Sequence, residues 1–297
     1  MKFGIMAMQM EALLPPVSNG QEAMQHVASF SHAGLIRKLH SAGFSLIELG
    51  GDLGMWFPTA FSPTAIEELA QLKDKLELAY SVHLPLWSVE PSTPLQAVRL
   101  GSVQALTDCI HATLPLQPAC YVLHATGALA AEFYQMRLPP AGKGLILRQF
   151  QQNALQSIQE LLQQTGLPPR KLAIETIEFP FDLTLEMAER LDLSVCLDTG
   201  HVLAGFSGAL DVFTVLEQVL PHLGEVHLHD CPRPARPDQP SYGMDHQPLG
   251  SGDLDTARLL DRLSESGFDG PVIFELTVPQ ALSSLQVIRQ LRPALLA

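Results

Sequence analysis

Acidic and histidine side chains stand at the ends of short apolar runs in the C-terminal half of the chain. Glu175 follows Ile174, Asp198 follows Leu197, His227 follows Val226 and Glu275 follows Phe274. Carboxylates and imidazoles are costly to bury alone, but one divalent cation pairs with several of them at once. The pattern therefore predicts a metalloenzyme. Its predicted metal ligands are Glu175, Asp198, His227 and Glu275.

The ligand types restrict the metal and its chemistry. Three carboxylates and one imidazole suit Mn, Zn, Mg or Co. Three negative charges around a dication also leave basicity for proton transfer. A buried ion pair or a solvated loop residue is the simpler explanation for any single glutamate, but four such positions with few basic partners nearby favour the metal.

A second group of histidines also lies close to predicted strand ends. With Glu175 as a bridge, His83 and His124 could hold a second metal beside the first, the arrangement by which hydrolases activate water. His201 and His246 are further metal-ligand candidates, although each histidine could equally bond substrate or a backbone carbonyl. His229 points to the same side of its strand as His227, so we expect one to be a ligand and the other a neighbour that contacts substrate.

Composition indicates one large core and argues against a nucleic-acid substrate. Hydrophobic residues make up 46% of the 297 residues and charged residues 16%, which suits a sheet wrapped by helices. We expect a single domain over residues 1–297. The 31 acidic and 18 basic residues give a formal charge of −13, which repels a phosphate backbone. Nucleic acid is thus an unlikely partner, and a small molecule is expected instead.

The four cysteines and the N-terminal residues indicate a cytoplasmic protein. Cys109, Cys120, Cys196 and Cys231 show no close paired spacing, so we expect them to be reduced. The first residues form no signal-peptide core, and no apolar stretch approaches the roughly 20 residues of a membrane span. No membrane partner is expected, and homo-oligomer formation stays open.

Short apolar runs alternate with helical patterns along the whole chain, which implies parallel strand pairing. We predict a (β/α)8 TIM barrel, because the segment after the first strand, residues 8–11, lacks the glycine-rich loop typical of a doubly wound sheet. The expected strands are Phe3 to Met8, Ser45 to Leu49, Ala79 to Leu84, Cys120 to His124, Leu172 to Thr176, Ser194 to Asp198, Glu225 to His229 and Val272 to Leu276.

Two long connections follow predicted strands, at residues 126–144 and 230–250. In such barrels the loops at the carboxyl ends of the strands build the active site, so we expect both connections to shape the pocket. Trp56 and Trp87 also follow strands and could stack on a sugar ring, with loop packing at least as plausible.

The ordered series of these motifs resembles the xylose isomerase-like TIM-barrel superfamily, which includes sugar phosphate isomerases and epimerases as well as endonuclease IV. The resemblance covers almost the whole chain. It rests on the following segments, in order: His83-Leu84-Pro85, His124, Glu175, Asp198-Thr199-Gly200-His201, His227-Leu228-His229-Asp230, Asp245-His246-Gln247-Pro248-Leu249-Gly250 and Glu275-Leu276.

Similarity to tagatose 3-epimerase-type enzymes implies one metal held by the four predicted ligands, with Glu175 and Glu275 as acid and base. It also implies a catalytic-site role for His201 and substrate contact by Arg233. A solvated loop position is the alternative for Arg233. Phe181 departs from the pattern, because those epimerases carry a further glutamate there, and Glu178 is out of register.

Similarity to endonuclease IV implies more metals. Its first site matches His83, His124 and Glu175, its second matches the four predicted ligands, and its third matches His201, His246 and an aspartate. That aspartate position falls on Met244, one residue before Asp245, which puts a complete third site in doubt. Two segments, residues 82–86 and 175–181, also resemble metal-dependent phosphodiesterases of the cobamide-remodelling type.

Three functions follow from these residues. The first is a sugar or sugar phosphate isomerase or epimerase that shuttles a proton through an enediolate, which we favour narrowly. The second is a phosphodiesterase with two or three metals acting on a small phosphoester. The third is a metal-binding scaffold without turnover. The first predicts one metal, and the second predicts that His83 and His124 are ligands.

Overall fold

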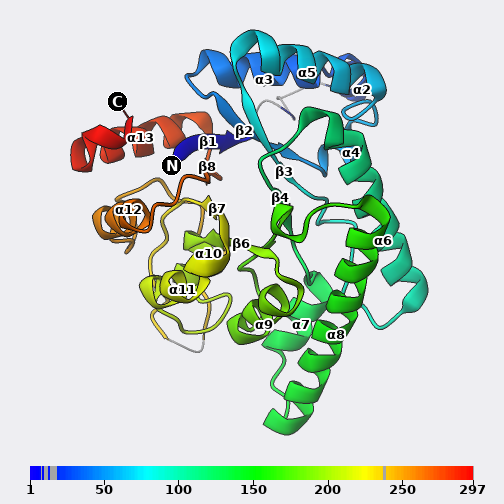
Figure 1. The fold of residues 1–297 in the computed structure, drawn as a ribbon, viewed down its shortest axis with the longest axis vertical. Coiled ribbons are helices and arrows are strands. Elements are labelled where there is room, and N and C mark those ends of the chain that lie inside the picture. The colour runs from blue at the N-terminus through cyan, green and yellow to red at the C-terminus, as the bar shows by residue number, and fades with distance from the viewer. Residues whose placement is uncertain (8, 10–12, 14–18, 237–238, 297) are drawn as a thin grey trace.

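Eight parallel strands of the described residues close into a barrel in their sequence order, β1 to β8 (Figure 1). The computed structural model describes residues 1–7, 9, 13, 19–236 and 239–296. This confirms the (β/α)8 prediction. The strands are β1 (Lys2–Met6), β2 (Leu46–Gly50), β3 (Ala79–His83), β4 (Tyr121–Leu123), β5 (Leu172–Glu175), β6 (Ser194–Asp198), β7 (Leu223–His227) and β8 (Pro271–Phe274).

Helices follow the strands and surround the barrel (Figure 1). The α-helices are α2 (Gly20–Ser29), α3 (His32–Ser41), α4 (Leu53–Trp56), α5 (Pro63–Leu76), α6 (Gln96–Thr113), α7 (Ala128–Gln135), α8 (Pro140–Thr165), α9 (Phe181–Leu191), α10 (Thr199–Ala204), α11 (Val212–Val219), α12 (Thr256–Glu265) and α13 (Val278–Leu291). Short 3-10 helices are η1 (Leu114–Leu116), η2 (Pro169–Lys171), η3 (Leu220–His222) and η4 (Pro293–Leu296).

Local sequence explains where several helices begin and end. Ser62 caps α5 by accepting a hydrogen bond from the backbone N–H of Ala65, and Pro63 occupies the first turn. Gly43, Gly166 and Gly267 have φ values of 104°, 66° and 74° in the left-handed region, where glycine pays no Cβ penalty. These residues therefore mark the start of α5 and the ends of α3, α8 and α12.

The long connection expected at residues 126–144 contains α7 and the first turn of α8. Pro140 stands at the start of α8, where its missing N–H removes no helical hydrogen bond. The glycines and prolines that suggest a loop are thus compatible with helix. Met8, at the end of the first predicted strand, and residues 237–238 of the second connection lie outside the described residues.

The first and last strands close the barrel side by side. β1 pairs with β8 from Lys2 opposite Pro271 to Ile5 opposite Phe274. The amide of Gln9 reinforces this seam by donating to the carbonyl of Leu276, 267 residues away in the chain, and by accepting from the N–H of Val278. Pairing of β1 with β8 thus fixes the segment that carries Glu275.

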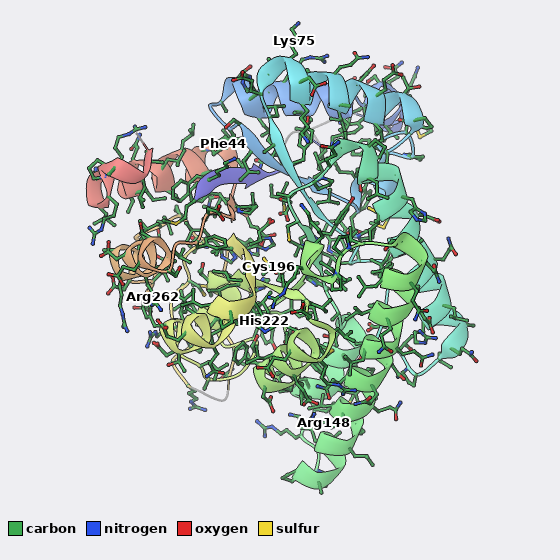
Figure 2. All side chains as sticks on the ribbon, in the orientation of Figure 1. Phe44, Lys75, Arg148, Cys196, His222 and Arg262 are labelled. Carbon is green, nitrogen blue, oxygen red and sulfur yellow. The ribbon has the colours of Figure 1, made fainter. Side chains whose placement is uncertain are left out.

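The barrel interior holds both small apolar and polar side chains. Cys120, Val122, Ala173 and Cys196 pack together as one buried cluster. Figure 2 labels Cys196 near the middle of the molecule, with Lys75, Arg148 and Arg262 at its periphery. The Ser81 hydroxyl on β3 donates to Glu225 on β7 at 3.0 Å. Because β3 and β7 are not neighbours, this contact crosses the interior.

No helix of the described residues is long and apolar enough to span a bilayer. Within the same residues, all four cysteines are buried free thiols.

His32 at the start of α3 should make stability sensitive to acid. Its ring is buried, and Nδ1 lies 3.0 Å from the carbonyl oxygen of Ala60. Burial lowers the pKa of His32 from 6.5 to about 4, with the bond to Ala60 opposing this only in part. Its contribution to stability is complete above pH 6.5 and is lost as the pH falls toward 4, by about 3 kcal/mol in total.

Urea unfolding at pH 7 and pH 5 measures this effect. His32→Phe keeps an aromatic ring against Phe61, which the histidine contacts edge-on, but cannot bind a proton. Between pH 7 and pH 5 the free energy of unfolding should fall by about 2 kcal/mol less in the variant than in the parent. Equal losses in the two proteins would show that His32 does not titrate on unfolding.

Candidate metal centre

The predicted ligands meet at the carboxyl end of the barrel because each stands at or just after the end of its strand. Glu175, Asp198 and His227 are the last residues of β5, β6 and β7, and Glu275 follows β8 directly. The strand register places Asp198 opposite His227. All four side chains are buried. The barrel therefore brings four residues that are distant in sequence to one point.

The first donor group joins His83, His124 and Glu175. The Nε2 atoms of His83 and His124 lie 3.1 and 2.9 Å from the same oxygen, Oε2 of Glu175. Nδ1 of His83 is 2.9 Å from the carbonyl oxygen of Leu84, so its N–H donates there and Nε2 is left to face the carboxylate. Three ligand atoms of this group lie within 4.8 Å of one another.

The second donor group surrounds Nδ1 of His227. This nitrogen lies 3.5 Å from Oε1 of Glu175, 3.7 Å from Oδ2 of Asp198 and 3.4 Å from Oε1 of Glu275. It is buried and has no hydrogen-bond partner among the described residues. An unpartnered ring nitrogen facing three carboxylates is the donor arrangement that a divalent cation satisfies.

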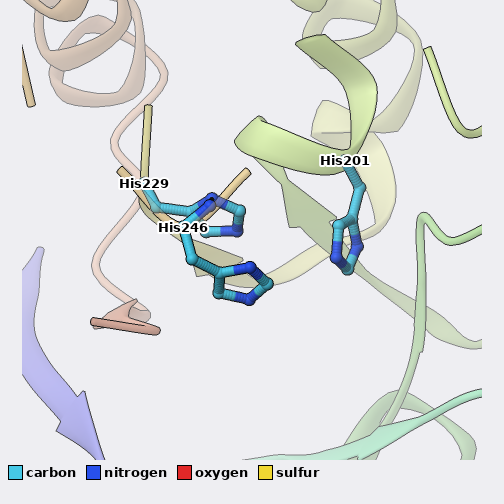
Figure 3. Close-up of side chains that lie close together, drawn as sticks. All are labelled: His201, His229 and His246. Carbon is cyan, nitrogen blue, oxygen red and sulfur yellow. Dashed lines mark hydrogen bonds between the residues drawn. The ribbon is translucent and has the colours of Figure 1, made fainter. Parts of the chain in front are cut away.

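The third donor group comprises His201, His229 and His246 (Figure 3). The rings of His229 and His246 stack at 4.3 Å with an interplanar angle of 9°, and His201 stands apart from them. Asp245 joins this group, with Oδ2 2.7 Å from Nδ1 of His246 and 3.9 Å from Nε2 of His201. His246 has a φ of 56°, a strained conformation that clusters at functional sites. Met244 is half exposed, so the neighbouring aspartate is the one that turns inward.

His229 is fully buried, and both of its ring nitrogens have partners within the protein, so of the third group His201, His246 and Asp245 keep ligand atoms for a metal. Nδ1 of His229 accepts the backbone N–H of His246 at 2.9 Å, and its Nε2 lies 3.0 Å from Oδ2 of Asp198. Nε2–H therefore donates to Asp198 and orients that carboxylate. The α10 backbone at Gly200 lies so close that a Cβ there would be 2.1 Å from the His229 ring.

The charges of these groups shift one another's pKa values. Burial alone would raise the pKa of Glu175, but His124 and His227 hold it well below its ordinary range. Burial alone would lower the pKa of His83 and of His201, but Glu175 and Asp198 raise them to about 9 each. For His246, Asp245 and Glu275 outweigh burial and raise the pKa to about 11. The cluster thus attracts positive charge strongly.

The donor set fits divalent metal. Among the described residues, no lysine or arginine forms an ion pair with Glu175, Asp198 or Glu275. The ionisable partners recorded for these three carboxylates are imidazoles, which ligate metal when neutral. Glu175 could serve both groups as a ligand, because its Oε2 faces the first group and its Oε1 faces the second.

Two buried glutamates beneath the centre were missed by the sequence analysis. Oε1 of Glu48 on β2 lies 3.4 Å from Nε2 of His227, and Oε1 of Glu225 lies 3.9 Å from it. Burial and the charge of Glu48 raise the pKa of Glu225 well above its ordinary range. The available signal was a charged residue inside each apolar strand, Leu46-Ile47-Glu48-Leu49 and Glu225-Val226.

A cavity of about 780 Å³ opens onto the centre. Six of its lining residues belong to the three donor groups: His83, His124, Glu175, His201, His246 and Glu275. Trp87 is part of the lining and is half exposed. Trp56 is absent from the described lining of this cavity. Arg233 is exposed and paired with Asp211 at 3.2 Å, so the structure does not bring it to the centre.

The connection at residues 230–250 reaches the centre through His246 and is fixed by Asp230. The carboxylate of Asp230 is fully buried and accepts hydrogen bonds from the backbone N–H groups of Cys231, Gly250, Gly252 and Leu254. Asp230 and Gln247 also form an antiparallel bridge. Asp230 therefore holds the end of the loop that brings His246 to the cavity, whereas no residue of the other connection, 126–144, belongs to the described lining.

Comparison with known families assigns the fold. The profile described as "Xylose isomerase-like TIM barrel" matches residues 36–293. The chain belongs to this family. Among curated proteins, this xylose isomerase-like chain is 23% identical over 242 residues to the uncharacterised protein MJ1311 of Methanocaldococcus jannaschii, covering 77% of this chain and 75% of the relative.

Solved structures with the same fold include enzymes of different chemistry. A D-tagatose 3-epimerase-like protein matches with a TM-score of 0.71 and 19% identity, covering 99% of this chain and 98% of the other. Endonuclease IV from Thermus thermophilus matches with a TM-score of 0.66 and 18% identity, covering 99% and 100%. At these identities the likeness shows that the xylose isomerase-like chain shares their fold.

Proposed function

We propose that this xylose isomerase-like protein is a multinuclear metal-dependent hydrolase of small-molecule phosphoesters. One observation carries the proposal: the two oxygens of Glu175 face separate donor groups, with His83 and His124 on Oε2 and His201 and His227 on Oε1. A metal at one donor group would engage one of these oxygens, so the two imidazoles on Oε2 favour a second metal. Divalent cations held there would lower the pKa of water and neutralise negative charge on a phosphoryl group.

The protein's own residues would hold the metals, orient the ligands and enclose the substrate. Glu175 bridges the first two donor groups, and His229 fixes Asp198 through its Nε2–H. His246 and Asp245 approach from the loop after β7 and complete the side of the centre that faces the cavity. The half-exposed ring of Trp87 offers a flat apolar surface to the organic part of a substrate.

The substrate would be small because the charge of −13 opposes a polyanion. A phosphodiester of a small molecule carries a single charge, which bound cations offset. The cavity of about 780 Å³ is large enough for such a ligand. These features favour a small phosphoester over DNA.

A sugar or sugar phosphate isomerase or epimerase is the second candidate. Glu175 and Glu275 both approach Nδ1 of His227, at 3.5 and 3.4 Å, so a metal there would have a carboxylate on two sides that could remove and return a proton. The epimerase-like structural relatives favour it. In that case His83 and His124 would contact substrate rather than metal.

Metal stoichiometry and turnover together test the proposal. Elemental analysis would compare the protein purified without chelator with His83→Ala and His124→Ala, and with His111→Ala, an exposed histidine of α6, as the control. We expect at least two metals per chain, about one fewer in each of the first two variants, and hydrolysis of bis(p-nitrophenyl) phosphate.

One metal per chain, unchanged in these variants, together with epimerisation of D-tagatose, would replace the proposal by the second candidate. Bound metal without either reaction, over a broad panel of phosphoesters and sugars, would favour a binding scaffold. Loss of metal in His111→Ala as well would show that the substitutions act by unfolding.

A further inference from the structure

Beneath the metal centre lies an inner carboxylate layer, which we define as Glu48, Ser81 and Glu225. All three residues are fully buried. They come from β2, β3 and β7, and Glu48 is paired with Ser81 in the strand register. Carboxylates so far from water need a local reason to be there.

His227 connects this layer to the donor groups above it. Its Nε2 lies 3.4 Å from Oε1 of Glu48 and 3.9 Å from Oε1 of Glu225. The hydroxyl of Ser81 donates to Oε1 of Glu225 at 3.0 Å. Glu48 is therefore the nearer acceptor for a proton on Nε2, and Glu225 is already engaged by Ser81.

The opposite ring nitrogen faces the other way. Nδ1 lies between 3.4 and 3.7 Å from one oxygen each of Glu175, Asp198 and Glu275. A neutral imidazole has one N–H and one lone pair, and the partner of the N–H decides which nitrogen keeps the lone pair. A proton on Nε2 leaves the Nδ1 lone pair in the middle of the three carboxylates.

We propose that Glu48 is a positioning residue of the metal centre, which accepts Nε2–H of His227 and so fixes the tautomer and orientation that place the Nδ1 lone pair toward the metal. The inference rests on the metal centre of the proposed function but not on its substrate. Glu225, held by Ser81, lies farther from Nε2 of His227, at 3.9 Å. Strand hydrogen bonds fix the backbone of Glu48 and His227, so the pair is formed before metal binds.

The alternative is a cation bound by the inner carboxylate layer itself. Oε2 of Glu48 and Oε2 of Glu225 have no hydrogen-bond partner among the described residues, and a cation beside them would take Nε2 of His227 as a ligand. That arrangement would leave no proton on Nε2 for Glu48. The two arrangements therefore predict opposite protonation states of Nε2 of His227.

Zinc affinity in the absence of substrate provides the first test. Full-length protein stripped of metal would be titrated with Zn²⁺ in competition with a chromogenic chelator. Glu48→Gln keeps the size of the side chain and removes its charge, and should weaken the tightest site by about 10- to 100-fold. Glu225→Gln, the matched control in the same layer, should weaken it by less than about threefold.

The protonation state of His227 in the parent protein provides the second test, which needs no variant. In the zinc-loaded protein labelled with ¹⁵N-histidine, NMR should show His227 with its proton on Nε2. Assignment would use His227→Gln as the missing signal. A proton on Nδ1 would overturn the inference even if Glu48→Gln fails to fold.

The remaining outcomes are equally decisive. Unchanged zinc affinity in Glu48→Gln would sink the positioning role while leaving the metal centre intact. Loss of a whole equivalent of zinc in both Glu48→Gln and Glu225→Gln would replace it by a cation site in the layer. Failure of the parent protein to bind Zn²⁺ would overturn this inference together with the proposed function.

Discussion

Glu175→Gln should reduce turnover to about 0.1% of the parent rate. It should also reduce bound metal to less than one equivalent per chain. The carboxylate contacts His83 and His124 through one oxygen and His201 and His227 through the other, so one substitution removes a ligand from two donor groups. A neutral amide retains the shape but supplies no charge to offset a cation. A 1,000-fold loss corresponds to about 4 kcal/mol of transition-state stabilisation.

The measurement combines elemental analysis with hydrolysis of a chromogenic phosphodiester. Glu217→Gln is the matched control, because Glu217 is an exposed glutamate of α11 paired with Arg262, and it should retain full metal and activity. If Glu175→Gln kept its metal and lost only turnover, Glu175 would act as a base and not as a bridging ligand. That result would return the isomerase mechanism to first place.

Gly200→Ala should lower the free energy of unfolding by about 4 kcal/mol, although it adds a single methyl group. The new Cβ would lie 2.1 Å from Cε1 and from Nδ1 of His229. The ring cannot withdraw easily, because it is bonded to Asp198 and to the backbone of His246 and is stacked on the His246 ring. Overpacking and the loss of a buried hydrogen bond both contribute.

Urea unfolding of the metal-free protein would measure this change. Gly101→Ala is the control, because Gly101 lies in α6 and a Cβ there meets nothing within 4 Å. Alanine is the better helix former, so the control should gain about 0.5 to 1 kcal/mol. If Gly200→Ala were as stable as the parent, His229 would have room to move and could not be the residue that fixes Asp198.

The ends of the strands could be predicted well from the sequence, because the chemistry-bearing residues interrupt apolar runs. The apolar run that predicts a strand at Ser194 to Asp198 coincides with β6 at both ends. Once eight strands form a closed barrel, their carboxyl ends must converge, so Glu175, Asp198, His227 and Glu275 could be grouped from the sequence alone. His83 and His124 also stand near predicted strand ends, so they could be placed beside Glu175 in the same way.

What escaped prediction depends on three-dimensional packing. Glu48 looked like an ordinary charged residue in a strand, since nothing local reveals that its side chain meets His227 across the barrel, 179 residues away. The direction of a loop side chain is equally invisible, and Arg233 turned to Asp211 rather than to the centre. The sequence places His229 on the same side of its strand as His227. The close approach of α10, which encloses the His229 ring, cannot be read from the sequence.

The seam between β1 and β8 has a consequence for how the protein is made. Glu275 reaches the other ligands only after the last strand has paired with the first, and Gln9 bonds to a carbonyl 267 residues further along the chain. Contacts of such long sequence separation are slow to form. A ribosome-bound chain that has emerged only as far as β7 would already contain His83, His124, Glu175, Asp198 and His227, without the residue that completes their set. Acquisition of the full complement of metal is therefore expected to follow synthesis, as a late folding event.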